Sequence, residues 1–130
     1  MFSGDTVKLP STARACNGCD LLVHEALNAE MVGTMEREFG KAGRKRLEKI
    51  MADIQNYHTT PVEAAEVAKD GKAKMLVLSH IVPALPLSYL EAYYMKGVGD
   101  AFDGPVVLGQ DGMLFSLPAN KNSVEQADLL

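Results

Sequence analysis

The chain lacks long hydrophobic runs, an excess of positive charge and more than two cysteines, and each absence excludes a class of protein. No stretch approaches about 18 uninterrupted apolar residues, so no membrane-spanning helix is expected. Residues 1–5 contain no basic region followed by an apolar run, so we expect no signal peptide and a cytoplasmic location. The formal net charge of -4 argues against a general nucleic-acid-binding surface.

The two cysteines, Cys16 and Cys19, have the spacing Cys-Asn-Gly-Cys. Such a pair occurs in zinc ribbons and in redox motifs, but here no second cysteine pair or flanking histidine completes a metal cage. We therefore interpret them as two reduced thiols beside a turn.

Short apolar runs alternate with helical patterns, which indicates one domain of the α/β class in the 130 residues. Wholly apolar strands between helices are typical of a sheet that is covered on both faces. We predict strands at 1–3, 21–23 and 75–78. Asp111-Gly112, between the apolar runs 106–108 and 113–117, predicts a β-hairpin.

Three helices are predicted. The first, around Lys41–Gln55, starts with a basic run and has one apolar stripe at spacings of three and four. The second begins at Thr60 with the capping box Thr-Pro-Val-Glu and stops at Gly71. The third covers about Ser88–Lys96. The tail after Pro118 is polar, so we expect it to fray.

Polar side chains follow three predicted strands: Asp5, Glu25 and His80. If those strands are parallel neighbours, these side chains converge on one edge of the sheet, where α/β proteins build their sites. Each residue also has a structural interpretation. The aspartate suits a turn that bonds its own backbone, the histidine a hydrogen-bonded strand end, and the glutamate a solvated surface.

A fourth candidate, His58, directly precedes the capped helix. A helix N-terminus has free N–H groups and the positive end of the helix dipole. Together with Thr59 and Thr60, His58 is therefore predicted to bind an anion such as phosphate or sulfate.

Four segments, taken in order, resemble a known family. They are residues 2–6 (Phe-Ser-Gly-Asp-Thr), 20–26 (Asp-Leu-Leu-Val-His-Glu-Ala), 58–65 (His-Thr-Thr-Pro-Val-Glu-Ala-Ala) and 76–80 (Leu-Val-Leu-Ser-His), and residues 102–113 fit as well. They resemble the C-terminal half of metallo-β-lactamase-fold hydrolases, in the ribonuclease Z and arylsulfatase-like branch.

The resemblance implies a fold and a location for each part of the chain. Residues 1–118 would form one half of a four-layer αββα sandwich, with a mixed sheet, a terminal β-hairpin and about three helices. Residues 119–130 would be a polar tail. A sheet face made for a second sheet would need a partner, either the missing N-terminal half or a second copy in a homodimer.

The resemblance also implies roles for individual residues. Asp5 would bridge two divalent metal ions, zinc in the first instance and manganese or iron as alternatives, and His80 would be a histidine ligand. His58 would contact the scissile group and help to protonate the leaving oxygen, held by Glu25. His24 would pack in its strand.

Three features depart from the family pattern. The His-x-His-x-Asp-His motif that supplies most metal ligands is absent, and all three histidines are already placed. The apolar segment after His80 and the long segment Asn28–Gln55 also differ from ribonuclease Z. The expected activity is two-metal hydrolysis of phosphodiester bonds in RNA. The alternatives are an arylsulfatase-like hydrolase of small anionic esters and an inert binding or dimerisation module.

Overall fold

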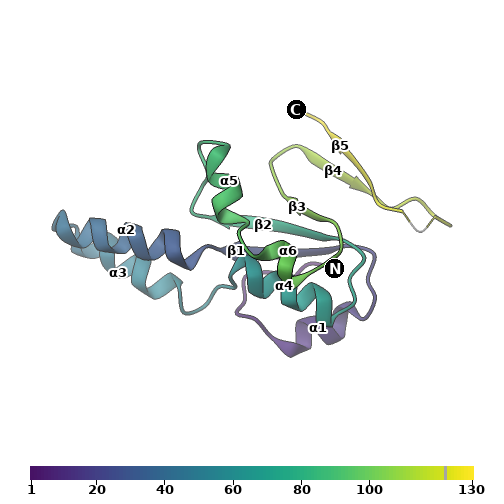
Figure 1. Ribbon diagram of the computed structural model, residues 1–130, viewed down its shortest axis with the longest axis horizontal. Coiled ribbons are helices and arrows are strands. Elements are labelled where there is room, and N and C mark those ends of the chain that lie inside the picture. Colours follow the sequence, from purple (N-terminus) through teal and green to yellow (C-terminus); the bar gives the residue numbers. More distant parts are fainter. Residues whose placement is uncertain (122) are drawn as a thin grey trace.

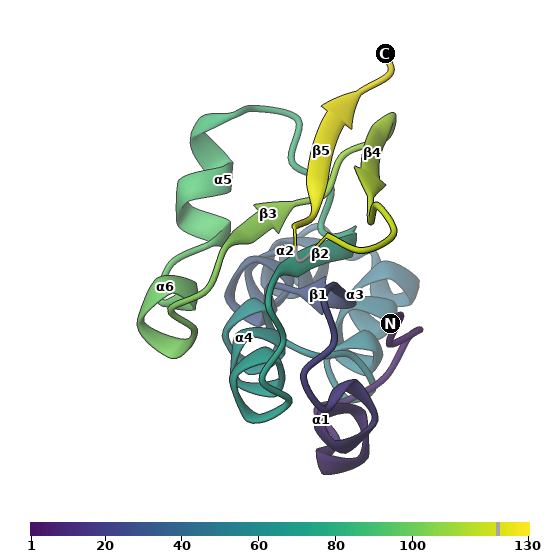
Figure 2. The same cartoon turned by 90° about the vertical axis from the view of Figure 1, so that its right-hand side faces the viewer.

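The computed structural model describes residues 1–121 and 123–130 (Figure 1). A three-stranded sheet lies at its centre, with α1 (Pro10–Cys16) and α4 (Pro61–Asp70) on one face and a β-hairpin, β4 (Met113–Ser116) and β5 (Glu125–Asp128), on the other (Figure 2). Within the described residues, no helix has the length and apolar character needed to cross a membrane. The elements in chain order are α1 (Pro10–Cys16), β1 (Leu22–Leu27), α2 (Ala29–Lys41), α3 (Lys45–Ile54), α4 (Pro61–Asp70), β2 (Leu76–Val82), α5 (Tyr89–Tyr94), α6 (Val98–Ala101), β3 (Val106–Leu108), β4 (Met113–Ser116) and β5 (Glu125–Asp128).

The central sheet is parallel, with strand order β1-β2-β3. The N-terminal segment extends it, because Phe2 forms a parallel bridge with Val23 and Ser3 N–H donates to the Val23 carbonyl at 2.9 Å. The carboxyl ends of these parallel segments lie at one edge of the sheet, as the sequence predicts.

Both long strands extend further than predicted. β1 ends at Leu27 and β2 at Val82, so Glu25 and His80 lie within strands rather than after them. The register between the two strands shifts here, since Glu25 pairs with Ser79 while Ala26 pairs with Ile81. His80 is the extra residue of this bulge.

The core lies between the sheet and α4. The capping box is confirmed: the Thr60 side chain accepts from Glu63 N–H, and the Glu63 carboxylate accepts from Thr60 N–H at 2.9 Å. Small side chains let the helix approach the strands closely. The buried core cluster includes Ala64, Ala65, Val67, Ala68, Leu76 and Leu78.

The helical part departs from the predicted three helices. α1 and α2 were not predicted, the first predicted helix begins only at Lys45, and α6 follows α5 after a turn at Gly97. Asn28 caps α2 by accepting from Met31 N–H at 3.0 Å. Gly33 and Gly40 within α2 weaken the helical pattern in the sequence, because glycine costs about 1 kcal/mol in a helix interior.

Three further predictions are corrected. The predicted hairpin between residues 106–108 and 113–117 does not form, because Val106–Leu108 joins the parallel sheet as β3. The terminal hairpin is formed instead by Met113–Ser116 and Glu125–Asp128. The tail that we expected to fray thus contains β5. Cys16 and Cys19 are joined in a disulfide, so the interpretation as reduced thiols is wrong.

Candidate functional site

The structure brings the four predicted residues together as two pairs. His80 Nδ1 lies 3.0 Å from Asp5 Oδ1, and both side chains are largely exposed. His58 Nδ1 lies 3.1 Å from Glu25 Oε1, and these side chains are only 8% and 2% exposed. The two imidazole rings meet edge to face with their centroids 5.4 Å apart. The site therefore has an exposed acid–histidine pair beside a buried one.

Backbone elements that are distant in sequence position these side chains. Asp5 lies on the loop that leaves the N-terminal segment, after Gly4 with φ +65°. His80 has φ +45°, a left-handed conformation that side-chain-bearing residues rarely adopt. Strained backbone of this kind persists only where the surrounding structure stabilises it, and it is concentrated at functional sites.

Glu25 connects the loop of Asp5 to the segment of His58. Its Oε1 accepts N–H bonds from Thr6 at 3.1 Å and from Thr59 at 3.0 Å. Its own N–H donates to Ser3 Oγ at 3.1 Å. Ser3 and Thr6 lie inside the recognised segment 2–6, but their positioning roles depend on contacts across the fold, which the sequence does not reveal.

In the buried pair of Glu25 and His58, two polar atoms have no hydrogen-bond partner among the described residues. These atoms are Glu25 Oε2 and His58 Nδ1. His58 Nδ1 and Glu25 Oε1 therefore lie within ion-pair distance, at 3.1 Å, but they do not form a hydrogen bond. Glu25, His58 and His80 each offer a ligand atom within 4.8 Å of the others. Mixed carboxylate and imidazole donors suit a borderline divalent metal such as zinc.

The predicted anion-binding role of the two threonines conflicts with their contacts. Thr59 donates its N–H to Glu25 and its hydroxyl to the Thr6 carbonyl. Thr60 donates both its N–H and its hydroxyl to the Glu63 carboxylate. Their donors are thus used inside the protein, and the His58 ring is the remaining candidate of the three for contact with an anion.

His24 is completely buried in β1, and burial lowers the pKa of its imidazole. Its Nδ1 lies 2.8 Å from the Glu25 carbonyl oxygen. It packs in the strand, as the resemblance implied.

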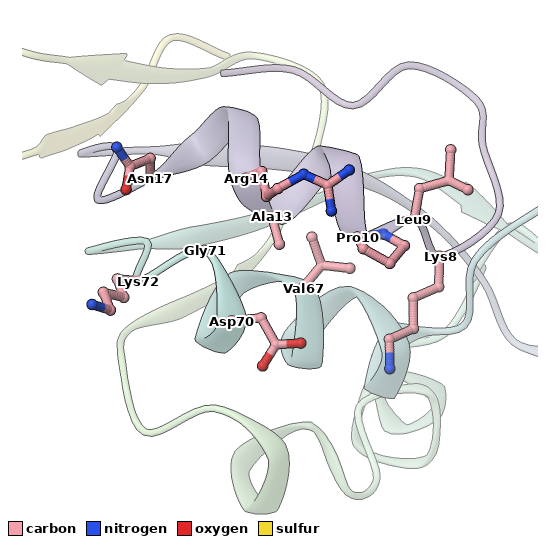
Figure 3. Close-up of a pocket in the computed structure, with 10 residues that line it drawn as sticks. All are labelled: Lys8, Leu9, Pro10, Ala13, Arg14, Asn17, Val67, Asp70, Gly71 and Lys72. Carbon is pink, nitrogen blue, oxygen red and sulfur yellow. The ribbon is translucent and has the colours of Figure 1, made fainter.

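A cavity of about 580 Å³ adjoins the exposed pair. His80 lines it together with apolar side chains such as Ile81 and Leu85 and the acidic Glu91 and Asp111. A second cavity of about 620 Å³ lies between α1 and α4 (Figure 3). It is lined by none of the four site residues, so it is separate from the candidate site.

Comparison with known proteins gives a consistent result. No family model matches the chain. It is 37% identical over 113 residues to ribonuclease Z of Haloarcula marismortui, covering 87% of this chain and 30% of that protein. It is 36% identical over 81 residues to ribonuclease Z of Bacillus subtilis, covering 62% of this chain and 21% of that protein.

Among solved structures, the metallo-β-lactamase-fold protein YhfI of Bacillus subtilis aligns with a TM-score of 0.58 at 17% identity, covering 97% of this chain and 39% of that one. The chain therefore has the fold of part of a metallo-β-lactamase-fold protein. Its sequence is similar to ribonuclease Z, and it spans between about a fifth and a third of the length of these relatives. The predicted resemblance is confirmed.

Proposed function

We propose that the protein containing this chain is a metal-dependent hydrolase that cleaves phosphodiester bonds in RNA. The observation that carries the proposal is the convergence of His58–Glu25 and His80–Asp5 at one edge of the sheet. Relatives of similar sequence are ribonuclease Z, which supports RNA as the substrate.

Asp5 and His80 are the residues that we propose as metal ligands, with zinc as the metal. When bound, divalent ions would activate the attacking water and stabilise the charge that develops on the scissile group. Each zinc takes about four ligands. Two side chains do not provide them, so we propose that further ligands come from the rest of the protein.

His58 is proposed as the general acid. Its ring is 5.4 Å from that of His80, so a proton held on the imidazole lies beside the proposed metal ligand. Glu25 would hold the ring in place and stabilise its protonated form. Nδ1 of His58 has no hydrogen-bond partner among the described residues, so it could instead bind the metal. The alternative role of His58 is therefore that of a third metal ligand.

Hydrolysis assays on the complete protein test the proposal. We expect cleavage of a labelled structured RNA and of bis(p-nitrophenyl) phosphate, loss of both activities with a chelator, and recovery with zinc or manganese. Hydrolysis of p-nitrophenyl sulfate alone would instead identify an arylsulfatase-like enzyme. Inactivity on all three substrates with either metal would identify an inert module.

We also propose that the sheet face opposite α4 binds another polypeptide, the rest of the protein or a second copy in a homodimer. A groove of about 630 Å³ lies between this face and β4, lined by apolar side chains that include Val23, Val77 and Phe115. At its border Phe2 is 79% exposed and Leu117 is 51% exposed. Exposed apolar surface of this kind is typical of interaction sites.

Light scattering on the 14.0 kDa chain at micromolar concentration should therefore give a mass above that of a monomer. The double substitution Phe2→Ser/Leu117→Ser should shift the mass toward the monomer, because it removes apolar area from the face. Tyr89→Ser, at a 70% exposed position on α5, is the matched control and should leave the mass unchanged. A wild-type chain that is a monomer and that carries no other polypeptide in the gel lane would contradict the proposal.

A further inference from the structure

Helices α2 and α3 form a hairpin that projects from the body of the molecule (Figure 1). We call residues 29–54 the arm and residues 41–49, at the connection between its helices, the basic turn. The basic turn has five basic side chains and one acidic one, although the whole chain has a net charge of -4. The basic residues are Lys41, Arg44, Lys45, Arg46 and Lys49.

Two arginines of the basic turn are free to contact a ligand. Lys41, Lys45 and Lys49 each pair with a carboxylate on their own helix. Among the described residues, Arg44 and Arg46 make no side-chain hydrogen bond or ion pair, and both are exposed. Guanidinium groups bind phosphate oxygens in a bidentate manner, so they suit a phosphate ligand better than lysine does.

The position of these charges is unfavourable for the helix itself. Arg44 occupies the N-cap of α3 without a side-chain capping bond, and Lys45 and Arg46 follow in the first turn. Basic residues at this end repel the positive end of the helix dipole, and serine, threonine or aspartate would cap it better. Residues that disfavour the local structure in this way are expected at functional sites.

Both ends of the arm are attached at the candidate site. Asn28, which caps α2, follows the strand that contains Glu25, and α3 ends at Ile54, shortly before His58. The 13 residues of α2 rise by about 1.5 Å each, which places the basic turn about 20 Å from the arm's base. A small ester cannot span that distance, whereas a polynucleotide can.

We propose that the basic turn binds the phosphate backbone of the RNA whose scissile bond lies at the His58–His80 site. This inference rests on the proposed function and extends it by assigning a second contact surface to the substrate. An anionic membrane surface fits less well, because the basic turn has a single large apolar side chain, Leu47, and this residue is already partly buried.

Binding and catalysis of the complete protein test the inference separately. Fluorescence anisotropy with a labelled RNA hairpin, in the presence of a chelator to prevent cleavage, compares wild type with Arg44→Ala/Arg46→Ala. We expect about tenfold weaker binding, and a slope of log affinity against log salt that is smaller by about 1.5. Lys69→Ala/Lys96→Ala removes the same charge at exposed positions elsewhere and should match wild type.

In steady-state assays the arginine variant should raise KM for the RNA several-fold, with unchanged kcat and unchanged hydrolysis of bis(p-nitrophenyl) phosphate. RNA binding equal to that of the lysine control would overturn the inference. So would an arginine-dependent loss of binding to phosphatidylserine vesicles with RNA binding intact. Because anisotropy does not depend on cleavage, a protein that binds RNA through the arm but does not hydrolyse it would refute only the proposed function.

Discussion

His58→Ala is expected to lower kcat of the complete enzyme by about 10²–10⁴ and to leave its metal content unchanged. The imidazole lies beside Glu25 and is almost completely buried, so it is held in one orientation next to His80. Removing a positioned general acid slows proton transfer to the leaving oxygen. It does not remove a ligand that the metal needs.

His80→Ala is the matched comparison, because it removes the other imidazole of the same site. That variant should lose both activity and metal in elemental analysis, as expected of a ligand. Loss of metal in His58→Ala as well would make His58 a ligand, consistent with its place in the cluster of Glu25, His58 and His80. A folded and fully active His58→Ala enzyme would exclude both roles.

Local sequence signals predicted the elements that depend on local contacts. The start of α4 is the clearest case, because the capping box between Thr60 and Glu63 involves only neighbouring residues. α2 depends instead on its packing against α3, which outweighs the cost of Gly33 and Gly40. The disulfide between Cys16 and Cys19 could not be predicted from the spacing, because two thiols pair only when the backbone brings them together.

The candidate site was predictable to the extent that parallel strands place their ends together. From that rule we expected Asp5, Glu25 and His80 at one edge of the sheet, and they lie there in the structure. The roles of Thr59 and Thr60 were not predictable, since two carboxylates take up their donors and one of these, Glu25, lies 34 residues away from Thr59 in the chain. Contacts of that kind exist only after the fold has formed.

Glu25→Ala is expected to lower the free energy of unfolding by about 3 kcal/mol or more, a large share of the roughly 5–15 kcal/mol that stabilises a typical domain. The substitution leaves the N–H groups of Thr6 and Thr59 without their acceptor, and Thr59 is fully buried. It also removes the carboxylate that lies 3.1 Å from the His58 ring. Each buried donor that loses its acceptor costs about 1–3 kcal/mol.

Glu25→Gln separates this structural role from the positioning of His58. Both N–H bonds end on the same oxygen, Oε1, so an amide oxygen can accept them and most of the stability should remain. The amide carries no charge to stabilise a protonated His58, so kcat should still fall. Urea denaturation and steady-state kinetics measure the two effects.

Glu66→Ala is the control for Glu25→Ala, because it removes an exposed carboxylate paired with Lys8 and should cost at most about 1 kcal/mol. If Glu25→Ala were as stable as this control, the bonds to Thr6 and Thr59 would not hold the site together.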